Sequence, residues 1–271
     1  MVRIFGFLAG LVFCTALLMA LIFTPRAATA HPEQAFLQHP RSAHLASSGP
    51  FGHFDRAQLQ RGLKVYKEVC SACHGLSLVA LRDVAQLGYD EDQVKNLAAQ
   101  FQVPGVNPDT GEAATRPGTP VDHFPSPYPN EIAARAANNN ALPPDLSLIT
   151  KAREGGADYV YSLLTGYRPV PGNLPAELRP SGTLHYNPWF HSLNIAMAPP
   201  LTSEGQVTFD DGTRATVDQM ARDVSAFLVW TAEPKLENRL RTGWAVLGFL
   251  LALTTLAYLS YRAIWADKKK H

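Results

Sequence analysis

The stretch Cys70-Ser71-Ala72-Cys73-His74 decides how this chain is interpreted. The pattern C-x-x-C-H is the attachment signature of a c-type haem. Two residues between the cysteines place both sulfurs on one side of a helical turn, where they can form thioethers to the porphyrin vinyl groups. His74 then offers an imidazole to the iron. The motif therefore predicts one covalently bound haem c.

Two other kinds of site share the C-x-x-C spacing: a thioredoxin-like redox pair and half of a zinc site. A redox pair has no use for the adjacent histidine. A zinc site needs two more ligands at close spacing, and the third cysteine, Cys14, lies in an apolar N-terminal run. Both alternatives are weaker than haem attachment, and no cysteine is left for a disulfide.

Residues 1–30 have the pattern of a secretory signal peptide that is cleaved. Arg3 gives the positive start, residues 4–23 are apolar, and Ala28-Thr29-Ala30 is an A-x-A cleavage sequence. The apolar run is longer than the roughly 7–15 residues usual in such signals, so an uncleaved anchor is the alternative. In either case the domain that follows is exported, which agrees with haem attachment outside the cytoplasm.

A second apolar segment, residues 243–261, carries no charge over about 19 residues, enough to cross a hydrocarbon core of ~30 Å. Aromatic residues of the interfacial type flank it, and a basic tail follows. We therefore predict a haem domain at 31–242 in the periplasm, one transmembrane helix at 243–262 and a cytoplasmic tail at 263–271. The protein would be a single-pass membrane protein.

The charge of the exported part differs from that of the whole chain, which is +1. Residues 31–242 contain 18 lysines and arginines against 22 aspartates and glutamates, which leaves a net charge of −4. A mildly acidic domain argues against nucleic acid as a partner and suits a basic protein partner. Ordinary solubility explains the same charge equally well.

Apolar periodicity and capping residues predict a mainly α fold with long irregular loops and one small β-hairpin. Asp55 is the expected N-cap of the first helix, with Gln58 in the capping-box position. Further helices are expected at 90–101, 130–137, 157–166 and from Thr216, and a short amphipathic segment at 76–87. Gly166 would close the helix before it. Asp145 or Ser147 would cap the helix after the Pro143-Pro144 turn.

Two loop regions complete the prediction. Residues 104–129 contain seven prolines and are expected to be irregular, because proline cannot continue a helix or a central strand. Asp210-Asp211-Gly212, between two short β-prone runs, indicates a hairpin turn.

The sixth iron ligand separates an electron carrier from an enzyme that binds substrate at iron. Met197 lies in a segment with Pro199 and Pro200, which excludes a helix and holds the chain extended. Met220 lies on an apolar helical stripe and is the candidate for core packing. His185 and His191 are the remaining alternatives, although a lone loop histidine is more often a surface residue. Met197 is the preferred ligand.

From Phe51 to Arg262 the chain resembles the cytochrome c1 family, the haem subunits of quinol–cytochrome c reductase (cytochrome bc1) complexes. C-x-x-C-H alone is common to all c-type cytochromes, whereas further motifs in this order are specific. They are Arg116-Pro117-Gly118, residues 136–147 (AANNNALPPDLS), residues 162–167 (SLLTGY), residues 186–190 (YNPWF), residues 195–200 (IAMAPP) and residues 230–234 (WTAEP).

The resemblance implies that Cys70 and Cys73 carry the haem and that His74 and Met197 are its axial ligands. It also implies contacts of Arg153 and Tyr159 with the haem propionates, as a guanidinium and a phenol suit carboxylates. Three further residues would line the haem pocket: Asn138, Pro143 and Pro144. Two departures stand out: Asn140 occupies a position where the family commonly has glycine, and the extra disulfide of some bacterial members has no cysteines here.

The function implied is one-electron transfer in a respiratory chain. Electrons would come from the Rieske iron–sulfur protein and leave to a soluble c-type cytochrome. The chain would share a complex with cytochrome b and the Rieske protein, and two such complexes would form a dimer. No general acid, base or nucleophile is required of the chain itself. A free-standing membrane-anchored carrier or terminal-oxidase subunit, and a haem enzyme of the peroxidase type, are the alternatives.

Overall fold

The computed structural model describes residues 2–23 and 32–266. The chain divides into two units, residues 1–35 and 36–271. The first unit holds the apolar helix α1 (Val2–Phe23) and a 3-10 helix, η1 (Pro32–Ala35). The cleavage sequence predicted at Ala28-Thr29-Ala30 lies outside the described residues.

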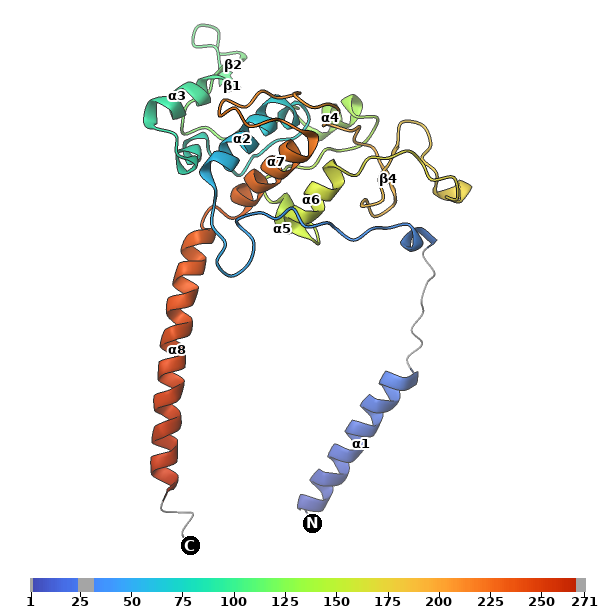
Figure 1. Ribbon diagram of the computed structural model, residues 1–271, viewed down its shortest axis with the longest axis vertical. Helices are drawn as coiled ribbons and strands as arrows, with labels where there is room; N and C mark the ends of the chain where they lie inside the picture. Colours follow the sequence, from blue (N-terminus) through green and yellow to red (C-terminus); the bar gives the residue numbers. More distant parts are fainter. Residues whose placement is uncertain (1, 24–31, 267–271) are drawn as a thin grey trace. The chain divides into compact units, whose positions relative to one another are not determined.

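The second unit confirms a mainly helical fold with two small two-stranded sheets (Figure 1). Its elements in chain order are α2 (Arg56–Glu68), η2 (Cys70–Ala72), η3 (Leu81–Leu87), α3 (Glu91–Ala99), β1 (Gln102–Val106), β2 (Ala113–Pro117), α4 (Glu131–Ala137), α5 (Ile149–Ala152), α6 (Gly156–Leu164), η4 (Ala176–Leu178), β3 (His185–Tyr186), β4 (Asn194–Ile195), α7 (Val217–Ala232) and α8 (Leu236–Trp265).

Helix α2 begins where its capping residue predicts. The carboxylate of Asp55 accepts a hydrogen bond from the backbone N–H of Gln58 at 3.2 Å. The amide of Gln58 does not close the expected capping box but donates to Asp223 of α7 at 3.1 Å. The helix ends at Glu68, before the C-x-x-C-H motif, because residues 70–72 tighten into the 3-10 turn η2.

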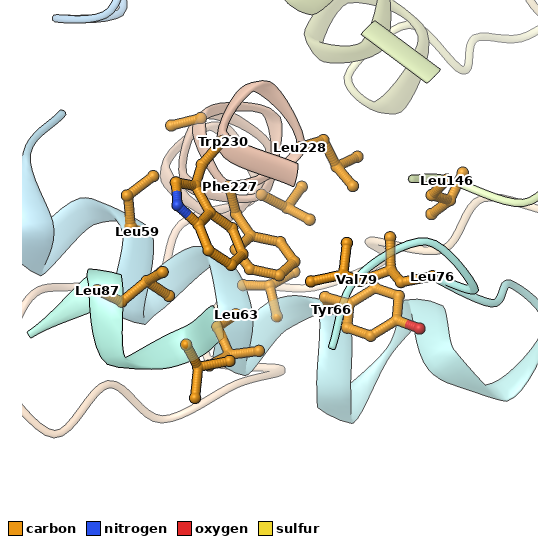
Figure 2. Close-up of a cluster of buried hydrophobic side chains, with 14 of the residues drawn as sticks. Leu59, Leu63, Tyr66, Leu76, Val79, Leu87, Leu146, Phe227, Leu228 and Trp230 are labelled. Carbon is orange, nitrogen blue, oxygen red and sulfur yellow. The ribbon is translucent and has the colours of Figure 1, made fainter. Parts of the chain in front are cut away.

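The hydrophobic core is built where α2 packs against α7. Figure 2 shows the side chains that α2 directs at α7, with those of the segments that follow α2 closing around them. The labelled residues are Leu59, Leu63, Tyr66, Leu76, Val79, Leu87, Leu146, Phe227, Leu228 and Trp230. All of them are buried, so the helix that leads into the C-x-x-C-H motif is anchored in the hydrophobic core of the domain.

The backbones of α2 and α7 approach closely at one glycine. A Cβ atom at Gly62 would lie 2.1 Å from the carbonyl oxygen of Asp223 and 2.6 Å from Cβ of Phe227. Beside this crossing, the fully buried carboxylate of Asp223 accepts hydrogen bonds from Gln58, from Gln219 at 2.8 Å and from Arg61 Nε at 2.8 Å. Apolar packing and one buried polar hub therefore fix the two helices together.

The β-structure differs from the prediction. Strands β1 and β2 form an antiparallel ladder from Gln102↔Pro117 to Val106↔Ala113, mostly within the segment 104–129 that was expected to be irregular. Both strands of a two-stranded ribbon are edge strands, so the missing backbone N–H of Pro104 costs the ladder little stability. The turn at 210–212 forms with Gly212 at φ +77°, but its flanking residues are not strands, so the hairpin prediction was wrong there.

The remaining helices follow the predicted pattern with two corrections at their ends. Helix α6 ends at Leu164, and Gly166 is needed for close packing instead, since a Cβ there would lie 2.3 Å from the ring of Trp189. Helix α5 starts at Ile149 without a side-chain cap, so the capping role predicted for Asp145 or Ser147 was wrong. Asp90, Asn130 and Thr216 do cap α3, α4 and α7.

Among residues 2–23 and 32–266, two helices are long and apolar enough to cross a membrane: residues 3–23 within α1, near the N-terminus, and α8. The side chains of both apolar windows are exposed. Helix α8 starts seven residues before the predicted span, and the charged residues Glu237, Arg239 and Arg241 lie in its first two turns. Those turns extend the helix beyond its uncharged part, toward the core of the domain.

Candidate functional site

The two cysteines of the C-x-x-C-H motif lie on the 3-10 turn at the end of α2. The backbone N–H groups of Cys73 and His74 both donate to the carbonyl of Cys70, at 3.1 and 2.9 Å, which folds the three residues onto one turn. Both thiols are free and half-buried. Burial, followed by the neighbouring Cys73, raises the pKa of Cys70 to about 12, so this group is a thiol at neutral pH.

His74 is held in one orientation by a backbone carbonyl 70 residues further along. Its Nδ1 lies 2.7 Å from the carbonyl oxygen of Pro144. A carbonyl can only accept, so Nδ1 carries the proton and Nε2 is left with its lone pair, as metal-ligating histidines require. Burial lowers the pKa of His74, against smaller opposing contributions from Pro144 and Asp145. The neutral imidazole is the form that binds iron.

The segment 143–147 is clamped to the residues that follow His74. Leu146 N–H donates to the carbonyl of Gly75 at 2.9 Å, and Ser77 N–H donates to the carboxylate of Asp145 at 2.8 Å. Leu78 N–H donates to Ser147 Oγ at 3.1 Å. The double proline stiffens the start of this strap. The strap keeps the Pro144 carbonyl at the imidazole.

Met197 lies in a non-helical segment just after β4 and is half-buried. Its carbonyl oxygen accepts a hydrogen bond from the hydroxyl of Tyr167 at 2.9 Å. Met220, by contrast, is fully buried in the α2–α7 core, as predicted from its helical stripe. Of the two histidine alternatives, His185 lies in β3 with its ring against Tyr167, and His191 is exposed in a turn.

Arg153 interacts electrostatically with Tyr159, and Tyr159 with Tyr167, which is bonded to the Met197 backbone. Burial raises the pKa of Tyr159, and the guanidinium of Arg153 partly opposes this. Tyr159 in turn contributes, after burial, to the raised pKa of Tyr167, whose hydroxyl holds the Met197 carbonyl. The side chain of Arg153 is exposed and therefore available to an anionic group.

The zinc alternative finds no support in the geometry. Within residues 2–23 and 32–266, no three histidine, cysteine, aspartate or glutamate side chains come together as a metal site. The two thiols of Cys70 and Cys73 and the imidazole of His74 do share one turn with a fixed tautomer. This donor set fits covalent haem attachment with an imidazole ligand.

Comparison with known proteins decides the family. Residues 45–268 match the Cytochrome C1 family. The chain belongs to this family.

Three relatives show how far the similarity extends. The chain is 47% identical over 233 residues to "Cytochrome c1" of Rhodospirillum rubrum, covering 82% of this chain and 85% of the relative. It is 47% identical to "Cytochrome c1, heme protein, mitochondrial" of Saccharomyces cerevisiae, covering 82% and 69%. It is 48% identical to "Cytochrome b/c1" of Bradyrhizobium diazoefficiens, covering 81% of this chain but only about a third (34%) of that relative.

The departure from the family pattern at Asn140 has a local explanation. Asn139 and Asn140 have φ of +51° and +65°, in the left-handed region that favours glycine. Asparagine tolerates this region better than other side chains do.

The amide of Asn138 donates to the carbonyl of Ala134 and to the hydroxyl of Tyr128, so its side chain holds the end of α4.

Sequence reasoning missed three residues that hold His74, Met197 and the segment 143–147 in place. The hydroxyl of buried Tyr66 donates to the carbonyl of His74 at 3.0 Å, Tyr167 holds Met197, and Asp145 holds the strap. All three occur in the quoted motifs or beside them, but nothing in the sequence identifies their partners. A surface hollow of about 470 Å³ lies away from these residues, between α2, α3 and residues 209–211.

Proposed function

We propose that this chain carries one haem c, bound through thioethers to Cys70 and Cys73 with His74 and Met197 as axial ligands, and transfers single electrons within a cytochrome bc1 complex. The observation that supports this most directly is the hydrogen bond between His74 Nδ1 and the Pro144 carbonyl, since it prepares Nε2 for a metal. The relatives named as heme proteins support the cofactor.

The chain's own residues bind and orient the cofactor. Haem c, when bound, supplies an iron that changes oxidation state by one electron. Pro144 fixes the imidazole of His74, and Tyr167 fixes the backbone of Met197. The thioether of Met197 and the imidazole of His74 would together raise the reduction potential of the haem and leave no position at its iron for a substrate, as electron transfer requires. Arg153 and Tyr159 would bind the propionates, and Asn138, Pro143 and Pro144 would line the pocket.

The two apolar helices support the proposed membrane topology. Residues 1–30 would be a signal peptide that is removed, residues 31–242 a periplasmic domain, and residues 243–262 the single span of a bacterial inner membrane. The basic residues after position 261 would stay in the cytoplasm. The support is the length and exposed apolar surface of α8 together with the positive tail.

The partners are proposed from family membership. Cytochrome b and the Rieske iron–sulfur protein would share the complex, itself a dimer, and a soluble c-type cytochrome would accept the electron. The net charge of −4 on residues 31–242 suits a basic acceptor. Turnover with a soluble basic cytochrome should then fall as the salt concentration rises. A flat response to salt would remove the charge argument, and purification without cytochrome b and a Rieske protein would favour a free-standing carrier.

The ligand assignment is tested by two methionine substitutions. Met197→Ala should abolish the weak red-edge absorption band that oxidised, thioether-ligated haem c shows. Met220→Ala should keep that band and lower only the thermal stability, because its side chain is packed in the core. The reverse pattern would overturn the assignment. A wild-type iron that binds peroxide readily would favour the peroxidase alternative.

A further inference from the structure

The junction between the domain and α8 carries an exposed pair of aromatic rings. Phe51 stacks on Trp244 with ring centroids 5.1 Å apart and an interplanar angle of 7°. Phe51 remains 77% exposed and Trp244 47% exposed, so the pair presents a joint apolar surface. Buried aromatic pairs are common in cores, whereas this exposed pair at the start of a candidate span is a surface on which an apolar partner can lie.

The loop that carries Phe51, residues 46–53, is closed by backbone hydrogen bonds. The N–H of His53 donates to the carbonyl of Ala46 at 3.0 Å, which closes the loop. At its tip, Gly52 N–H donates to the carbonyl of Gly49 at 3.2 Å, forming a turn with Pro50 and Phe51 as its central residues. Proline is favoured at the first central position because its φ is already set. The tip therefore presents Phe51 in a defined direction.

The loop is also fastened to the start of α8, beside which it lies in Figure 1. The indole N–H of Trp244 donates to the carbonyl of Pro50 at 3.0 Å. Glu237 accepts from the backbone N–H of Phe54 at 2.7 Å and pairs with Arg56 at 3.6 Å. Since the indole N–H of Trp244 already has its acceptor within the chain, this donor stays paired when the aromatic pair enters an apolar medium.

The position of Trp244 along α8 sets the depth of this surface. Between Arg241 and Arg262 lie 20 residues without a charge, which span ~30 Å at ~1.5 Å per residue. Trp244 is the third of them, so the rings of Trp244 and Phe51 are level with the first turn of the span. A proline-tipped aromatic loop at that level meets the headgroup and upper acyl region of the bilayer, the zone that aromatic side chains favour.

We propose that the loop 46–53 is a second membrane contact, in which Phe51 and Trp244 together insert into the lipid interface on the domain side of the bilayer. The occupant of this surface is lipid. The contact fixes the inclination of the domain to the membrane, because the domain is then held at two points, α8 and the loop. This inference rests on the proposed span of α8.

The test measures the immersion depth of a nitroxide label. Cysteines replace Phe51, Leu250 or Ile132 singly in the full-length, haem-bearing chain with Cys14→Ser, in nanodiscs of phosphatidylcholine and phosphatidylglycerol. Oxygen concentrates in lipid and a nickel chelate stays in water, so the ratio of their collision rates reports depth. Leu250, in mid-span, is the lipid reference, and exposed Ile132 on α4 is the water reference.

The label at residue 51 should give a ratio much closer to that of Leu250 than to that of Ile132. A label at Ser48, which leaves Phe51 in place, should lose oxygen access and gain nickel access when Phe51→Ser is added, whereas Ile132→Ser should leave it unchanged. These two results together support insertion.

Three results would overturn the inference. If residue 51 matches Ile132 while Leu250 is in lipid, the loop is in water and only the span stands. If Leu250 is itself in water, the proposed span is wrong and the inference falls with it. If, in the complex isolated from membranes, the label at residue 51 is shielded from both reagents, a protein covers the loop and lipid is the wrong occupant.

Discussion

Replacing Gly62 by alanine tests the reasoning about the α2–α7 crossing, because two effects of known size oppose each other there. Alanine favours a helix over glycine by about 0.5–1 kcal/mol. Its Cβ, however, would lie 2.1 Å from the carbonyl oxygen of Asp223 and 2.6 Å from Cβ of Phe227. Both neighbours belong to the same helix, so α7 as a whole has to move away.

The expected loss in the free energy of unfolding is the cost of the clash minus the gain in helix propensity. Overpacking a core costs about 1–3 kcal/mol, occasionally more, and a clash with backbone belongs at the upper end of that range. After the helix-propensity gain, the net loss should be about 2 kcal/mol. For a domain of this length, about 2–4 °C of melting temperature corresponds to each kcal/mol, so Gly62→Ala should lower it by about 4–8 °C.

Thermal unfolding of the purified haem-bearing chain, followed by far-ultraviolet circular dichroism, measures this shift. Gly172→Ala is the matched control, since a Cβ there meets nothing within 4 Å and its φ lies outside the left-handed region. The control should be neutral or slightly stabilised through the unfolded state. A Gly62→Ala chain that melts at or above the wild-type temperature would refute the close approach of the two helices.

Three further outcomes are expected from single substitutions. Tyr167→Phe removes the hydroxyl that donates to the Met197 carbonyl, a hydrogen bond that contributes about 1 kcal/mol. The imidazole concentration needed to displace the methionine from the iron, read from the visible spectrum, should therefore fall about fivefold. Asp223→Ala removes the buried acceptor of Arg61, and urea unfolding should show a loss of about 3 kcal/mol or more, whereas an unchanged midpoint would contradict the hub. Hydrogen bonds from the backbone of Thr213 and from Arg61 lower the pKa of Asp211 to about 2, below its unfolded value of about 3.9. The ionised carboxylate therefore contributes its full stabilisation above about pH 4 and loses it as the pH falls toward about 2. Asp211→Asn should flatten the dependence of melting temperature on pH in that window.

Short-range patterns in the chain were sufficient for much of this picture. The C-x-x-C-H turn, the caps at Asp55, Asp90 and Thr216 and the apolar stripe of α7 are each defined by residues within a few positions of one another. Hydrogen bonds of a turn or a cap close between such neighbours, so local sequence determines them. The same holds for the two long apolar helices of the described residues, whose length and apolar composition make them candidate spans.

The β-structure was decided by pairing that local propensity does not encode. Both 102–117 and 207–215 can form a turn, but only the first forms a ladder, despite its prolines. Residues 207, 209 and 215 are instead buried against the helical core. Burial of apolar side chains therefore took precedence over strand pairing at 207–215.

What the sequence by itself determined is the chemistry of the site: two cysteines and a histidine on one turn, a methionine held outside any helix by prolines, and two segments apolar enough for a membrane. Only the tertiary structure decided which distant groups hold those residues. The Pro144 carbonyl reaches His74 across 70 residues of chain, and the Tyr167 hydroxyl reaches Met197 across 30. A backbone carbonyl is the same in every residue, so its partner is selected by the path of the chain, and that path is set by how the buried surfaces of α2 and α7 pack.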